Sequence, residues 1–164
     1  MAQHGLLAPS CVGAPRGSRN HDGTIIPDRV DCMWGTDLTT TRTGEGQVAV
    51  FVAVDHHSAE CVGLHATLRA TRFEALEPIR QGVRRCFRAF ANNVAQGLAV
   101  RHDHGSQYMS DAFQKELAFL GIESSPAFVR APEGNGCAER FIRTLKENLL
   151  GFAPSTPSNS SARR

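Results

Sequence analysis

The sequence lacks a long apolar segment and a secretory leader. Its longest apolar run is Val48 to Val54, far short of the roughly 18 residues that cross a bilayer. The first residues do not show a basic stretch followed by an apolar one, so a signal peptide is not expected. These absences predict a cytoplasmic protein with no membrane partner.

Paired cysteines and a strong charge are also missing. The five cysteines are widely scattered and none has C-x-x-C spacing, which argues against a zinc site or a disulfide framework and for reduced thiols. The formal net charge is only +2, too small by itself to indicate a nucleic-acid partner. The cysteines lie at Cys11, Cys32, Cys61, Cys86 and Cys137.

The composition divides the chain into three zones. Residues 1–28 hold Gly, Pro, Arg, His and Ser without periodicity, and are interpreted as an N-terminal arm or linker. Residues 29–150 carry all the regular patterning. Residues 151–164 are rich in Ser and Pro, so this tail is expected to be disordered because it cannot bury a core.

The hydrophobic patterning predicts an α/β domain. Three strands, over 30–38, 47–54 and 61–68, are close enough in the chain to form an antiparallel meander. A helix over 72–90 follows, its buried stripe running from Phe73 to Phe90. A strand over 98–100 then leads to Asp103. Next come a helix capped by Ser110 and ended by Gly121, a strand from Ile122, and a helix over 136–150 with Leu149 facing inward. This order predicts a mixed five-stranded sheet flanked by helices.

Three acids stand out by their placement. Asp37 is expected at the end of the first strand, Asp103 at the end of the fourth, and Glu139 in the first turn of the last helix. Clustered carboxylates repel one another unless a cation neutralises them, and hard oxygen ligands suit Mg²⁺ or Mn²⁺. From spacing alone, three ordinary solvated acids remain an alternative.

Four sequence blocks surround these acids. Residues 34–39 read W-G-T-D-L-T, 54–58 read V-D-H-H-S, 102–108 read H-D-H-G-S-Q-Y, and 133–141 read E-G-N-G-C-A-E-R-F. Thirty-five residues separate Asp103 from Glu139. In content, order and spacing, the blocks resemble the catalytic core of insertion-sequence transposases and retroviral-type integrases, the D,D-35-E group.

The resemblance implies a ribonuclease-H-like fold and DNA transposition by metal-dependent strand nicking and strand transfer. Asp37 and Asp103 would hold the metals, and Glu139 would complete the second of two Mg²⁺ or Mn²⁺ sites, about 3.5–4 Å apart. The implied partners are DNA, as element ends and as target, and a homo-oligomer or a full-length transposase. A bacterial enzyme of this kind is nucleoid-associated when bound.

Other residues near the acids are candidate DNA contacts. Arg143 and Lys146 follow Glu139 by four and seven residues, so all three share a helical face that can grip phosphates. The alternative is a solvated face with a Glu139–Arg143 pair. Asn135 is expected to orient either DNA or the turn that carries Glu139. Arg101 stands where the common family pattern has histidine.

The sequence also departs from the family. Residues 1–28 show no helix-turn-helix segment, and 151–164 bear no family resemblance, so a truncated or frameshifted copy is expected, with a complete triad on an incomplete scaffold. Two alternative functions remain open: an inactive remnant that binds DNA or full-length transposase without catalysis, and a metal-dependent nuclease of the same fold.

Overall fold

A meander of three antiparallel strands begins the part of the chain that the computed structural model describes, residues 27–127 and 135–150. The strands are β1 (Met33–Thr43), β2 (Gly46–Asp55) and β3 (Cys61–Thr67), with β2 paired to both neighbours. From Ala49 to Asp55, β2 is buried at every position. Its continuous apolar sequence therefore suits a central strand that is covered on both faces.

The rest of the fold alternates helices and short strands. These are α1 (Arg72–Cys86), β4 (Ala99–His102), α2 (Asp111–Leu120), β5 (Glu123–Pro126), α3 (Gly136–Leu145) and a π-helical turn η2 (Lys146–Leu150). The strand order is β3-β2-β1-β4-β5, with β4 parallel to both β1 and β5. The predicted mixed five-stranded sheet flanked by helices is confirmed, and its first and fourth strands are neighbours.

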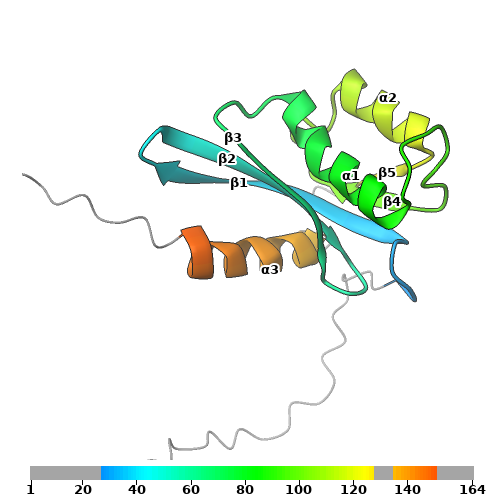
Figure 1. Ribbon diagram of the computed structural model, residues 1–164, viewed down its shortest axis with the longest axis horizontal. Helices are drawn as coiled ribbons and strands as arrows, with labels where there is room; N and C mark the ends of the chain where they lie inside the picture. The colour runs from blue at the N-terminus through cyan, green and yellow to red at the C-terminus, as the bar shows by residue number, and fades with distance from the viewer. Residues whose placement is uncertain (1–26, 128–134, 151–164) are drawn as a thin grey trace, which may run out of the picture.

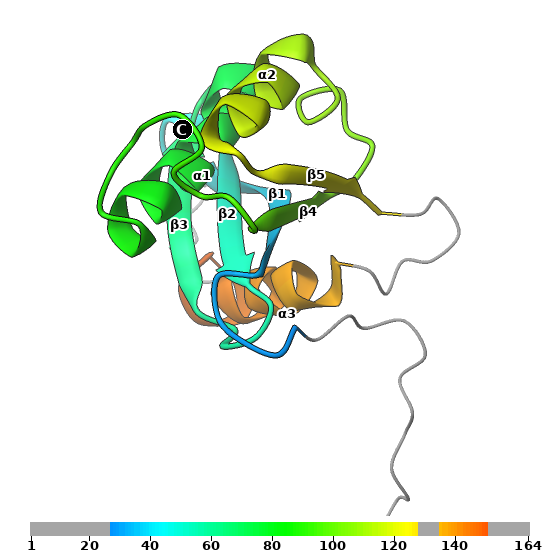
Figure 2. The same cartoon turned by 90° about the vertical axis from the view of Figure 1, so that its right-hand side faces the viewer.

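The sheet separates two layers of helix. Helices α1 and α2 cover one face and α3 lies on the other (Figures 1 and 2). Odd-numbered β2 residues such as Phe51 join the larger core beneath α1 and α2. Even-numbered ones join a smaller core with α3, formed by Val50, Val52, Val54, Ile142 and Leu145. Strand alternation thus assigns each side chain of β1 and β2 to one helical layer.

The first strand was predicted too short. It continues to Thr43, so Asp37 lies in the middle of β1 rather than at its end. The threonine-rich segment after Leu38 pairs with the first half of β2 as a hairpin, and this pairing holds polar residues in an extended conformation.

Two helix predictions were also wrong in part. Helix α1 ends at Cys86, since Arg88 adopts a positive φ of 57°, and both Phe73 and Phe90 are exposed. Regular α-helix ends at Leu145 in α3, and Leu149 is 69% exposed rather than inward-facing. In both helices, the apolar residues at the predicted ends lie beyond the neighbouring elements that could bury them.

No helix in the described ranges is long and apolar enough to cross a membrane. Most of the predicted arm (1–28) and all of the predicted tail (151–164) lie outside the described residues, as do residues 128–134.

Candidate active site

The pairing of β1 with β4 aligns the first two acids. Gly35 and Asp37 alternate with Trp34 and Thr36, and therefore point to the α3 face. Gly35 is paired with Arg101 in the parallel register, and the same offset applied two residues later places Asp103 opposite Asp37. Because β4 ends at His102, Asp103 is the first residue beyond the strand and is exposed.

Helix α3 carries the third acid to the same region. It packs on β1 and β2 through Ile142 and Leu145, and Glu139 lies in its first turn, exposed. The predicted position of Glu139 in the helix is confirmed.

The pKa of Asp37 is affected by both of the other acids. Burial raises the pKa of Asp37 above its ordinary value, and the carboxylates of Asp103 and Glu139 raise this pKa further. Two groups lower it: the Leu38 N–H, which donates to Asp37 Oδ1 at 2.7 Å, and the Lys146 ammonium. Three acids from separate segments thus share one electrostatic environment.

The donor set suits a hard divalent cation, although the side chains do not form a closed cage. Within residues 27–127 and 135–150, no three His, Cys, Asp or Glu side chains converge tightly enough to ligate an ion as they stand. Three carboxylates repel one another, so without a cation they are expected to remain apart. Their oxygens match the ligands of Mg²⁺ and Mn²⁺.

Basic residues follow Glu139 along α3. Arg143 and Lys146 are exposed, and among the ion pairs of the described chain none joins Glu139 to Arg143. Lys146 is close enough to Asp37 to lower its pKa, so one cation of this face lies beside the acids.

Asn135 is buried rather than presented to solvent. The residue is 6% exposed, and its Nδ2 donates to the Thr36 carbonyl at 3.0 Å. Of the two roles expected from the sequence, this geometry favours orienting the turn that carries Glu139.

The residues around Asp103 are held by the helical layer and by β5. The His102 ring donates from Nδ1 to the Asp103 carbonyl at 2.7 Å, while its Nε2 accepts from the Ser124 hydroxyl at 2.9 Å. Burial lowers the pKa of His102, in keeping with a neutral ring. Arg101, in the family's histidine position, is buried and donates to the Ser125 hydroxyl at 2.9 Å.

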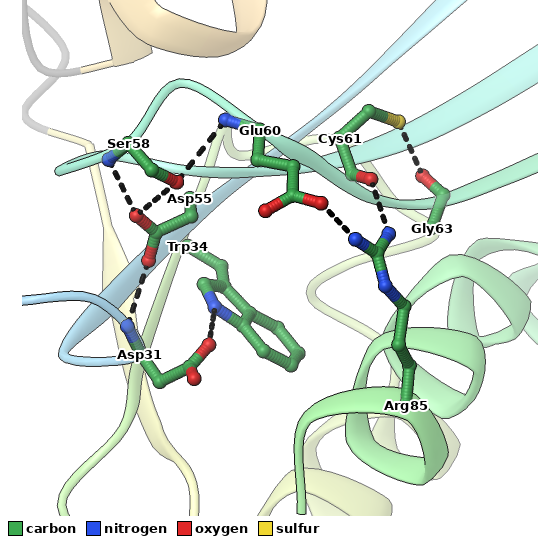
Figure 3. A network of polar contacts seen from close by, with 8 residues as sticks. All are labelled: Asp31, Trp34, Asp55, Ser58, Glu60, Cys61, Gly63 and Arg85. Atoms are coloured by element: carbon green, nitrogen blue, oxygen red, sulfur yellow. Dashed lines mark hydrogen bonds and ion pairs between the residues drawn. The ribbon is translucent and has the colours of Figure 1, made fainter.

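Asp55, the acid of the V-D-H-H-S block, has a structural role (Figure 3). It is buried and accepts the backbone N–H groups of Asp31, His57 and Ser58, together with the Ser58 hydroxyl, at 2.7–3.0 Å. The Asp31 carboxylate in turn accepts the Trp34 indole N–H at 3.1 Å. Asp55 therefore ties the turn after β2 to the segment that leads into β1.

Comparisons with known proteins indicate the family. Residues 27–132 match the family described as Integrase core domain. The transposase InsD for insertion element IS2A/D/F/H/I/K of Escherichia coli is 25% identical over 165 residues, which cover 99% of this chain and 54% of that protein. The chain therefore spans about half the length of this curated relative.

Solved structures share the fold. The HTLV-2 integrase catalytic core domain in complex with magnesium, in its trimeric form, superposes with a TM-score of 0.56 at 20% identity, covering 82% of this chain and 79% of that one. A chain of the simian T-cell lymphotropic virus intasome superposes with a TM-score of 0.63 at 20% identity, covering 82% and 47%. The ribonuclease-H-like fold is confirmed.

Proposed function

We propose that this chain, which belongs to the integrase core domain family, is the catalytic core of an insertion-sequence transposase. It nicks DNA at element ends and transfers the freed strand to target DNA. The observation that supports this most is the meeting of Asp37, Asp103 and Glu139 from three separate segments. Burial first, and then the carboxylates of Asp103 and Glu139, raise the pKa of Asp37.

The three acids are proposed as the metal ligands. Asp37 lies two residues beyond Gly35, the last β1 residue paired with β4, and Asp103 lies two residues beyond its partner Arg101. Glu139 comes from the first turn of α3. A related core, that of HTLV-2 integrase, was solved with magnesium. Bound here, one or two Mg²⁺ or Mn²⁺ ions would activate an attacking oxygen and neutralise charge on the scissile phosphate. Asp37, Asp103 and Glu139 would hold these ions, and Lys146 would add a cation for a DNA phosphate.

Arg143 and Lys146 are proposed as phosphate contacts, whereas Asn135 is proposed as a positioning residue because its amide is buried. Element ends and target DNA are the proposed substrates. A second copy of the chain or a full-length transposase is the proposed protein partner, and the bacterial cytoplasm the proposed location, in line with the Escherichia coli relative.

A second candidate function is binding without catalysis. The observation in its favour is the apolar surface of α3 and η2, where, among the described residues, Leu149 is 69% exposed and Phe141 is half-buried. Such an apolar surface can drive association with other chains.

The test is metal-dependent nicking of labelled DNA that carries the ends of the parent element. We expect cleavage with Mg²⁺ or Mn²⁺, none with EDTA, and a loss of at least about 100-fold in Glu139→Gln. Glu147→Gln is the matched control, since Glu147 is exposed in η2 and its substitution removes the same charge. Absence of cleavage by a folded preparation that still binds DNA would favour the second candidate.

A further inference from the structure

Thr36, the residue before Asp37, is buried completely. Its hydroxyl donates to the Val52 carbonyl at 2.8 Å, which fixes it to β2. Gly35 is the last β1 residue in register with β4, so Thr36 lies where the two strands part. Its carbonyl and side chain are therefore available to groups outside the sheet.

One such group comes from the segment of Glu139. Asn135, four residues before that acid, donates from Nδ2 to the Thr36 carbonyl. The absence of a side chain at Gly35 makes room for this contact, because a Cβ there would lie 2.6 Å from Asn135 Oδ1 and 2.7 Å from His56 Nε2. The start of α3 is thus held against β1 next to Asp37.

The second group comes from the segment of Asp103. Tyr108, five residues after that acid, is 1% exposed. Its hydroxyl lies beside the Thr36 side chain, although no described residue meets full hydrogen-bond geometry with it. The ring packs against His102 and Phe113, with centroids 5.6 and 5.3 Å away. The Tyr108 N–H donates to the Gly105 carbonyl at 3.0 Å, which ties the residue to the turn after Asp103.

We infer that Thr36 is the point at which the three acid-bearing segments are fixed to one another, and that Asn135 and Tyr108 are positioning residues for the acids. Asn135 reaches Thr36 through a hydrogen bond, and Tyr108 lies in the core beneath α1 and α2 with its hydroxyl near the Thr36 side chain. The inference rests on the proposed function, because it concerns the same three carboxylates.

The first test is the affinity of the full chain for Mn²⁺, measured by calorimetry. Asn135→Ala and Tyr108→Phe should each weaken binding by about tenfold or more, the usual effect of removing a group that orients metal ligands. Asn148→Ala is the matched control, because the Asn148 amide also donates to a carbonyl, at 2.8 Å, but within the helical segment. Unchanged Mn²⁺ affinity in both folded variants would overturn the inference.

The second test needs no metal. We expect Gly35→Ala and Asn135→Ala to speed amide hydrogen exchange in α3, and Thr36→Val and Tyr108→Phe to speed it in residues 105–109, while β2 and β3 stay protected. Exchange that becomes faster across the whole protein, or that stays unchanged in both α3 and residues 105–109, would contradict the inference. If the unaltered chain binds no Mn²⁺, the metal-dependent function fails, and the exchange pattern alone decides whether Thr36 joins the segments.

Discussion

Asp37 is partly buried beside two other acids, and this arrangement opposes folding at neutral pH. Its raised pKa, caused first by burial, means that the folded chain holds the Asp37 proton more tightly than the unfolded chain does. The contribution of Asp37 to the free energy of unfolding therefore falls as pH rises from about 4, the ordinary value for aspartate, through the folded-state pKa.

Removing this charge should stabilise the chain. We expect Asp37→Asn to raise the free energy of unfolding at pH 7 in EDTA, and to remove the part of the pH dependence that Asp37 causes. Urea unfolding between pH 4 and 7 measures both effects. Asp28→Asn, at an exposed position, is the control and should change little. A destabilised Asp37→Asn variant at pH 7 would show that the carboxylate is held by favourable contacts instead.

Asp55 presents the opposite case, an acid that stabilises the fold. Asp55→Asn should lower the free energy of unfolding by about 3 kcal/mol. The amide keeps one acceptor oxygen, so its NH2 group must face the N–H of Asp31 or those of His57 and Ser58, which then lose their acceptor. Ser58→Ala, which removes the hydroxyl bond to Asp55 and the acceptor of the exposed Glu60 N–H, should cost about 1 kcal/mol. Urea unfolding at pH 7 provides the comparison, and equal losses would contradict the central role given to Asp55.

The elements that the sequence predicted well are those with local signals at both ends. Helix α2 begins where the Ser110 hydroxyl accepts the Phe113 N–H and ends at Gly121, with φ of 77°. The extent of β1 was missed because its threonine-rich half is held by pairing with β2. Helix ends were predicted wrongly where apolar residues continue past the part of the helix that the rest of the fold buries, as at Leu149.

The contact of β3 with α1 depends on one glycine. A Cβ on Gly63 would lie 2.0 Å from the carbonyl oxygen of Pro78, a backbone atom that cannot rotate away. Gly63→Ala should therefore lower the free energy of unfolding by about 3 kcal/mol. Gly44→Ala is the control, with nothing within 4 Å, and should stay within about 0.5 kcal/mol. Similar thermal unfolding of the two variants would contradict the close packing.

For the molecule as a whole, the sequence predicts which acids form the site but not which contacts hold them. The sequence blocks around Asp37, Asp103 and Glu139 predict that these acids share a site. The parallel pairing of β1 with β4 explains why the segments of the first two acids lie side by side. The hydrogen bond of Asn135 with Thr36 joins residues 99 positions apart in the chain. No local pattern predicts such contacts, because they form only after the sheet and both helical layers assemble.

Binding of DNA should depend on the cations of the α3 layer. We expect Arg143→Ala and Lys146→Ala each to weaken binding across sequences and to reduce the slope of log affinity against log salt by about one. Lys115→Ala is the control, since Lys115 is exposed on α2 across the sheet from α3. Fluorescence anisotropy over a salt series measures the slopes, and an equal reduction in the control would assign the DNA to the other face.

The most direct test of the central claim is metal rescue at Asp103, measured as nicking of element-end DNA by Asp103→Cys in Mg²⁺ and in Mn²⁺. A thiolate is a poor ligand for Mg²⁺ but accepts softer ions. If Asp103 ligates the metal, nicking is lost with Mg²⁺ and returns at least in part with Mn²⁺, while Glu147→Cys behaves like the unaltered chain with both. Full activity of Asp103→Cys with Mg²⁺, or loss with both ions in a folded protein, would contradict metal ligation by Asp103.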